Sequence, residues 1–173
     1  MLDPRQDAVY RNWCVVAAAC ETVPPRSSFD PVEFPRSLSS LVLAERTEDD
    51  ALRFRLVGSD MVSAWGADFT GRHLHEIMSG DYHAFIRGLF DECIRRRAPL
   101  FSHSRFQWDR GRSLDTRRLM LPYARDDKPE EIGFVLVSQV FDYGRTGPQQ
   151  PIVSAGQKFD LIEIRREPLS TSL

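Results

Sequence analysis

The segment RFRLVGSDMVSAWGADFTGRHLHEI, residues 53–77, decides the fold because its hydrophobic periodicity changes along its length. Over its first residues apolar and charged side chains alternate, which is the period-two pattern of a strand with one buried face. Ser59 or Asp60 can then cap a short helix, and Gly66 is placed to end it because glycine tolerates the left-handed conformation. Residues 72–78 follow a second turn and predict another short helical or irregular piece.

The surrounding chain supplies four more strand patterns and one long helix. Residues 40–46 form an apolar run that a polar turn joins to the strand above, which predicts a hairpin. Residues 82–97 carry apolar side chains at i, i+3, i+4 and i+7, the spacing of an amphipathic helix. Three strand-like runs follow, at residues 100–108, 112–124 and 130–143. This order predicts an α+β domain built on a five-stranded antiparallel sheet with helices over one face.

Residues 1–25 predict an amphipathic helix before the sheet. Asp3 is placed as its N-cap and Gln6 as the partner in a capping box, and two prolines end it. The apolar stripe of this helix packs either on its own domain or against a second copy of the chain. The candidate dimerisation residues are Val9, Trp13, Val16, Ala17 and Cys20.

The predicted main domain covers residues 26–143, and residues 144–173 form a C-terminal tail. The first half of the tail is rich in Gly, Pro and Gln, a composition typical of linkers. Within the tail, KFDLIEIRR at residues 158–166 predicts a short strand or helix docked on a neighbour.

Three phrases of the sequence resemble the PAS domain superfamily. Residues 53–77 resemble its passage from the second strand through the short helices to a Thr-Gly turn. LMLPYARDDKPEEIGFVLVSQVF, residues 119–141, resembles the end of its sheet. DPVEFPRSLSSLVLAE, residues 30–45, is most similar to a compact single-domain PAS subfamily of alphaproteobacteria, formerly catalogued as a domain of unknown function.

The resemblance implies a cupped sheet with a pocket between it and its covering helices. PAS domains sense small molecules, bind cofactors, dimerise or dock partners, and in many a helix before the domain mediates dimerisation. Most of the converging apolar residues are expected to fill the core, and a subset to line a pocket if one is open. The candidate pocket residues are Phe54, Leu56, Met61, Trp65, Phe69, Phe85, Leu89, His103, Arg105, Leu121 and Phe134.

Cofactor and metal motifs find little support in the sequence. In haem-binding PAS domains a histidine on the long helix holds the iron; His83 is the nearest candidate, and we expect it to be an exposed residue beside the helix cap. The cysteine segment of flavin-binding light sensors is absent, and Cys93 falls too late on the helix, so neither cofactor is predicted. His73 and His75 could share one side of an extended segment, but no ligand set completes a metal site and Glu76 is expected to point elsewhere.

The net charge of −2 gives no general attraction to nucleic acid, although residues 95–118 alone carry +6. Such a segment either attracts an anionic ligand or forms a solvated surface balanced by carboxylates elsewhere. No apolar run approaches the roughly 20 residues that span a bilayer. We therefore expect a cytoplasmic protein without membrane or nucleic-acid contacts.

The leading hypothesis is a stand-alone, homodimeric sensory or regulatory module. It would bind a small molecule, a protein partner in trans, or both, and no catalytic residue or effector segment is predicted. One alternative is a small enzyme that uses a polar residue in the α+β cavity. Another is a pure interaction module whose core is filled.

Overall fold

The computed structural model describes residues 2–20, 23–109, 112–142 and 160–168. Its centre is an antiparallel sheet with the strand order β2-β1-β5-β4-β3-β6. The strands are β1 (Leu41–Arg46), β2 (Leu52–Val57), β3 (Leu100–Asp109), β4 (Arg112–Ala124), β5 (Ile132–Asp142) and β6 (Asp160–Pro168). The five predicted strands and their antiparallel pairing are confirmed, and β6 adds a sixth strand.

Strand β6 comes from the predicted tail and pairs antiparallel with β3 of the same chain. The sequence pattern of residues 158–166 is compatible with a strand or a helix, and the structure shows a strand. Because β3 would otherwise end the sheet, β6 pairs backbone groups that an edge strand leaves free. Strand β2 forms the opposite edge.

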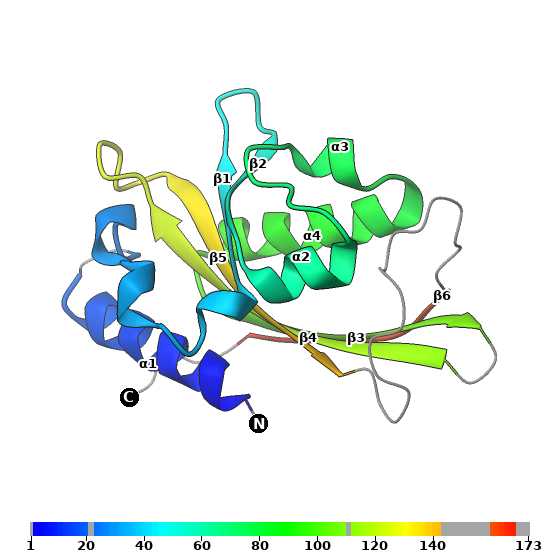
Figure 1. The fold of residues 1–173 in the computed structure, drawn as a ribbon. Helices are drawn as coiled ribbons and strands as arrows, with labels where there is room; N and C mark the ends of the chain where they lie inside the picture. Colours follow the sequence, from blue (N-terminus) through cyan, green and yellow to red (C-terminus); the bar gives the residue numbers. More distant parts are fainter. Residues whose placement is uncertain (1, 21–22, 110–111, 143–159, 169–173) are drawn as a thin grey trace.

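Helices cover both faces of the sheet (Figure 1). On one face lie α2, α3 and α4, and on the other lies α1. Their bounds are α1 (Pro4–Ala18), α2 (Ser59–Trp65), α3 (Leu74–Ile77) and α4 (Gly80–Arg96), and the short turns are η1 (Arg26–Ser28), η2 (Pro31–Glu33) and η3 (Leu38–Ser40). The sheet therefore has two apolar faces instead of the single one expected, and its strands β1, β4 and β5 carry buried residues on both sides.

Helix α1 begins with the predicted capping box, in which Asp3 and Gln6 bond each other's backbone. Gln6 is fully buried, and its side-chain amide also donates to the carbonyl oxygens of Arg117, at 3.2 Å, and Ser138, at 2.9 Å. These two carbonyls belong to the neighbouring strands β4 and β5. One side chain of α1 therefore ties the helix to the backbone of two central strands.

The apolar stripe of α1 packs on the chain's own sheet. Val9 and Trp13 are 1% and 2% exposed, and the Trp13 indole donates to the carbonyl of Pro122 at 2.9 Å. Val16, Ala17 and Cys20 at the end of the stripe are half-buried. Packing on its own domain is thus the alternative that holds for Val9 and Trp13, and these two cannot also contact a second copy while α1 stays docked. A homodimer remains a prediction, and its interface would have to use residues other than Val9 and Trp13.

The connection from β2 to α3 crosses the face opposite α1 and turns at glycines. Gly66 ends α2 with a φ of 81°, and Gly71 has a φ of 86° in the turn before α3. Both values lie in the left-handed region, where residues with a Cβ are strained. The predicted stop at Gly66 is confirmed, whereas the N-cap of α2 is Gly58 and not Ser59 or Asp60, the two expected caps.

Candidate functional site

The sheet face under α2 and α4 changes from apolar to polar along the strands. One cross-strand row consists of Val42, Val137, Met120 and Leu100, which are direct neighbours in the pairing. Two residues further along the strands, the equivalent row consists of Gln139, Arg118 and Ser102. Since side chains two apart point to the same face, both rows face the helices. The sheet face covered by α2 and α4 therefore has an apolar part and a polar part.

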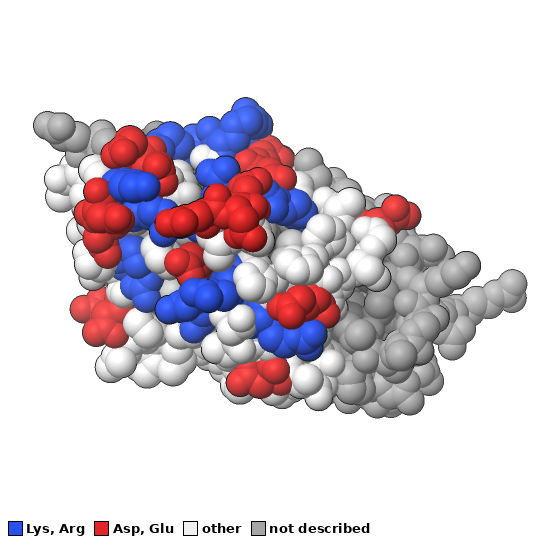
Figure 2. Space-filling model, turned by 90° about the horizontal axis from the view of Figure 1, so that it is seen from above, with Lys and Arg blue, Asp and Glu red and all other residues white. Residues whose placement is uncertain are grey.

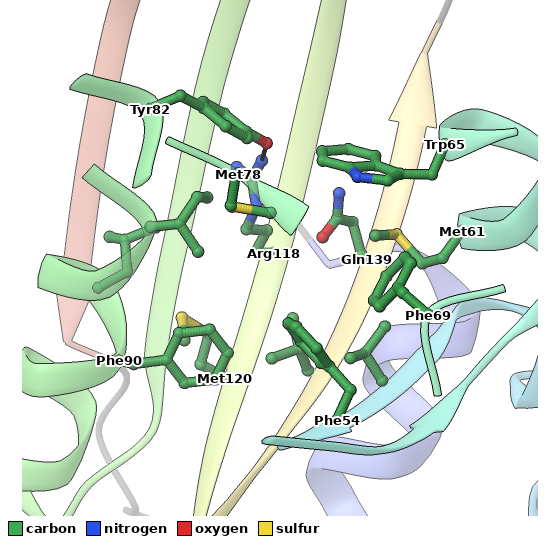
Figure 3. Close-up of a pocket in the computed structure, with 14 residues that line it drawn as sticks. Phe54, Met61, Trp65, Phe69, Met78, Tyr82, Phe90, Arg118, Met120 and Gln139 are labelled. Carbon is green, nitrogen blue, oxygen red and sulfur yellow. Dashed lines mark hydrogen bonds between the residues drawn. The ribbon is translucent and has the colours of Figure 1, made fainter. Parts of the chain in front are cut away.

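A cavity of about 40 Å³ lies above this boundary. It has room for a few water molecules, since each needs about 10 to 15 Å³. Figure 3 shows its side chains reaching in from the sheet and from the helical layer. The lining residues are Val42, Phe54, Met61, Trp65, Phe69, Met78, Tyr82, Ile86, Leu89, Phe90, Arg118, Met120, Val137 and Gln139.

Arg118 is the charged group of this cavity. Its side chain is buried, with 3% of the residue exposed, and it donates to the Ser104 hydroxyl at 2.7 Å. A longer contact of 3.5 Å reaches the Tyr82 hydroxyl, and the guanidinium lies 6.0 Å from the Phe85 ring centre. None of the carboxylates whose side chains the structure describes forms an ion pair with it. A buried charge without a counter-ion is costly for the folded protein.

Burial also shifts the titration of both polar groups at this end. It lowers the pKa of Arg118, an effect that the neighbouring Tyr82 partly opposes. It raises the pKa of Tyr82 above its ordinary value of 10.0. Arginine remains protonated in proteins, and the Tyr82 hydroxyl keeps its proton at neutral pH. The polar end thus presents one positive charge and a neutral hydroxyl.

A second donor faces the same cavity from α2. The indole nitrogen of Trp65 is buried and has no hydrogen-bond partner among the described residues. In Figure 3 it is turned toward the region where Tyr82, Arg118 and Gln139 gather. The hydroxyls of Ser102 and Thr116 lie on the polar part of the sheet face, outside the cavity lining, and are also buried with no partner in the part of the chain that the structure describes. Buried polar groups are almost always paired, so this end of the cavity has unused hydrogen-bonding capacity.

Six of the eleven residues predicted for the pocket belong to the buried cluster on the side of the sheet covered by α2 and α4. Phe54, Met61, Trp65, Phe69 and Leu89 line the cavity. Phe85 belongs to the same buried cluster but is not part of the lining, and its ring lies near the Arg118 guanidinium.

The other five predicted residues are on the opposite face, where the prediction is wrong. Leu56, Leu121 and Phe134 pack in the cluster beneath α1. His103 and Arg105 alternate with Ser102 and Ser104 on β3 and therefore point away from the cavity. The error has one cause: both faces of the sheet are apolar, so the alternation in the sequence does not tell which face is which.

His103 and Arg105 instead contact a carboxylate of the neighbouring strand. Arg105 donates to both oxygens of Asp115, at 2.8 and 2.9 Å, and a ring nitrogen of His103 lies 3.2 Å from the same group. The hydrogen bond from Arg105 is the largest cause that lowers the pKa of Asp115. This part of the basic segment is thus balanced by charge, whereas Arg118 is not.

The remaining candidate residues do not line the cavity. His73 is the N-cap of α3, and its backbone N–H donates to the Glu76 carboxylate at 2.5 Å, so the expectation that Glu76 points elsewhere is wrong. The His73 and His75 rings are stacked 5.4 Å apart. His83 is half-buried on α4 and is not part of the cavity lining. Cys93 is fully buried, and burial raises the pKa of its thiol.

Arginines and carboxylates are interspersed on the face seen in Figure 2. Among the ion pairs of the described residues, Arg87 contacts Asp50 at 2.7 Å and Asp91 at 2.8 Å. Such pairing leaves no broad field of one sign on the part of this face that the structure describes. Within the same described residues, no helix combines the length and apolarity of a membrane span, and no group of three potential ligands could hold a metal ion.

A comparison with known protein families identifies the family of this chain. A family model described as a PAS domain matches residues 1–136. This chain belongs to the PAS domain family. The matched range includes α1 as well as β1 to β4 and the first half of β5, so it spans both buried faces of the sheet. No curated protein matches the chain.

Sequence reasoning missed the polar residues of this PAS domain's cavity. Arg118 stands between Arg117 and Leu119, and Gln139 stands between Ser138 and Val140, so the adjacent residues do not separate a cavity residue from a surface residue. The informative signal is that Arg118 stands two positions from Met120 and Gln139 two from Val137. A charged or amide residue in phase with buried residues on a central strand is a candidate for an inward-facing group.

Replacing Arg118 with methionine is expected to make the ligand-free PAS domain more stable, by about 1 to 2 kcal/mol. The change removes a buried, unpaired charge and keeps an unbranched apolar stem in its place. Urea unfolding of both proteins measures the difference. Arg117→Met is the matched control, because Arg117 is half-buried on the opposite face; its effect should stay within about 0.5 kcal/mol. A clear loss of stability in Arg118→Met would show that its bonds to Ser104 and Tyr82 outweigh its burial.

Proposed function

We propose that this PAS domain is a sensory or regulatory module that binds a small, largely apolar molecule in the cavity between its sheet and helices α2 and α4. The observation that carries the proposal is a largely apolar cavity whose lining includes a buried Arg118 without a described counter-ion and the Trp65 indole N–H without a described hydrogen-bond partner. Ligand sites in proteins have this composition, with a few polar groups that orient the ligand. Cavities that stay empty are apolar, whereas the lining of this one includes Tyr82, Arg118 and Gln139.

The present volume is small, so binding requires the lining to move. Ligand pockets commonly enclose about 300 to 1,000 Å³, whereas this cavity has about 40 Å³. Met61, Met78 and Met120 line it from α2, from the segment before α4 and from β4. Methionine side chains are unbranched and flexible, and they adapt to occupants of different shape. The cavity is therefore suited to expand around a ligand.

The two alternatives are a small enzyme and an interaction module with a filled core. The titratable cavity groups, Arg118 and Tyr82, both stay protonated at neutral pH, which does not favour acid–base catalysis. The filled-core alternative differs from our proposal only in whether a ligand enters. We also propose that the protein is a cytoplasmic homodimer that signals to a protein partner in trans. We further propose that it belongs to the compact alphaproteobacterial PAS subfamily.

Native mass spectrometry of the protein purified from its own host tests ligand binding. We expect a mass increment that organic solvent removes. Val137→Phe adds bulk to the cavity floor and should abolish the increment, while Val15→Phe makes the same change at a position that is 62% exposed and should keep it. A protein that carries no increment and loses stability on Val137→Phe would instead favour the filled-core module, because added bulk then overpacks a core that has no space for it.

A further inference from the structure

We propose that the cavity ligand is a monocarboxylic acid with an apolar body, whose carboxylate pairs with Arg118. This inference rests on the function proposed above and names the chemical class of its ligand. It follows from the polar end of the cavity, where a buried cation has no counter-ion among the described side chains, although a buried arginine normally has one.

The charge of Arg118 demands an anion from outside the described side chains. The protein supplies hydroxyl oxygens from Ser104 and, at 3.5 Å, from Tyr82, but neither carries a negative charge at neutral pH. The guanidinium has five N–H donors in a planar fork, and the described residues use only part of this capacity. A carboxylate would accept two parallel hydrogen bonds from such a fork and neutralise its charge.

The neighbouring donors suit the same headgroup. The unpaired indole N–H of Trp65 and the amide of Gln139 line the cavity, and Figure 3 shows both beside the Arg118 end. Gln139 is the direct cross-strand neighbour of Arg118, so their side chains emerge from the sheet next to each other. A carboxylate has about four acceptor positions, enough to satisfy the guanidinium and one or two of these neutral donors.

The balance of charge selects a monoanion over a phosphate ester. A phosphate carries close to two negative charges at neutral pH and recruits several cations or a helix N-terminus. Among the lining residues, Arg118 is the cation, and the other polar members are the neutral Tyr82, Gln139 and Trp65. One positive charge and several neutral donors match a single carboxylate.

The opposite end of the cavity selects an apolar body for this acid. Phe54, Phe69, Phe90 and Met120 form that end, away from Arg118 in Figure 3. The Phe54 and Phe69 rings meet edge to face with centres 4.8 Å apart. A short alkyl chain or an aryl ring placed there would bury its surface against these side chains. Hydrophilic acids such as citrate would leave polar groups unpaired at this end.

Titration of the purified full chain with matched acids and neutral analogues tests the inference. The probes are hexanoate and octanoate against their primary amides, and benzoate against benzamide. Affinity is measured by calorimetry, and occupancy of the cavity by the NMR signal of the Trp65 indole N–H, which Trp65→Phe assigns. We expect at least one acid to bind about 10- to 100-fold more tightly than its amide, because charge-assisted hydrogen bonds replace neutral ones.

Arg118 variants show whether the preference arises at this residue. Arg118→Met should remove the preference for acid over amide, and Arg118→Lys should retain part of it, since lysine keeps the charge but lacks the planar fork. Arg117→Met, one residue away on the opposite face, should leave both affinities unchanged. Cooperative unfolding of each variant shows that it is folded.

The outcomes separate this inference from the function on which it rests. If amides bind as tightly as acids and shift the indole signal, the cavity binds ligands but the carboxylate assignment is wrong. If acids bind and Arg118→Met binds them equally well, Arg118 is not the recognition residue and the inference fails. If no acid or amide binds, the carboxylate assignment is overturned, while a retained molecule in native mass spectrometry would still support ligand binding of another class.

Discussion

Replacing Trp13 with alanine is expected to lower the free energy of unfolding by about 3 to 5 kcal/mol, the range for large aromatic residues removed from a core. Trp13 is 2% exposed and packs in the cluster between α1 and the sheet. Its loss leaves a cavity in the cluster that also contains Leu121 and Tyr123, and it removes the donor to the carbonyl of Pro122. Urea unfolding followed by circular dichroism measures the change.

Val15→Ala is the matched control for Trp13→Ala. Val15 lies on the same helix but is 62% exposed, so its truncation should change stability by no more than about 0.5 kcal/mol. Trp13→Phe separates the hydrogen bond from the packing and should cost about 1 to 3 kcal/mol, because the Pro122 carbonyl is left unpaired. If Trp13→Ala costs no more than Val15→Ala, α1 does not dock on the sheet in solution.

The same contact bears on the oligomeric state. A truncated chain that begins at Ser27 lacks α1 and exposes the apolar face formed by residues such as Leu43, Leu119 and Leu136. Exposed patches of this kind promote association. Light scattering should therefore show larger, less defined species for the truncated chain. A well-folded monomer would mean that α1 is dispensable for covering this face.

Gly58→Ala is expected to destabilise the protein by about 2 to 4 kcal/mol. Gly58 has ordinary backbone angles, with a φ of −70°, so the cost does not come from conformational strain. A Cβ at this position would lie 2.3 Å from the carbonyl oxygen of Ser39 and 2.6 Å from that of Leu38. These are backbone atoms, so relief requires η3 or the start of α2 to move, which places the cost at or above the usual range for overpacking.

Gly88→Ala provides the opposite result with the same chemical change. Gly88 lies within α4, and a Cβ there would meet nothing within 4 Å. The substitution should stabilise the protein by about 0.5 to 1 kcal/mol, because alanine favours the helix and restricts the unfolded chain. Thermal unfolding of the two variants should shift in opposite directions. A shift of equal sign and size would contradict the steric explanation for Gly58.

Periodicity predicted the elements of this fold well, because each element has one dominant period. Residues 82–97 repeat at helical spacing, and the structure forms α4 over Gly80–Arg96. The residues predicted from this layer, such as Met61 and Leu89, reached the cavity because a helix with one apolar stripe has only one way to face the sheet.

The strand residues of the cavity could not be predicted in the same way. In β4, Leu119 and Leu121 point to α1, while Arg118 and Met120 point to the cavity, and all four are buried. Their sequence looks the same from either side, so the face is decided by tertiary packing of α1, far away along the chain. The cost of burying Arg118 is invisible to a hydrophobic pattern, since it depends on the missing partner.

The hydrogen bonds of Gln6 have a mechanical consequence. Its amide bonds the carbonyls of Arg117 and Ser138, and each carbonyl belongs to the peptide unit that leads into a cavity residue, Arg118 or Gln139. A sliding of β4 relative to β5 of a few tenths of an ångström must lengthen or bend one of these bonds. The hydrogen bonds of Gln6 therefore make the first turn of α1 sensitive to the relative position of β4 and β5, although α1 lies on the opposite face of the sheet from the cavity.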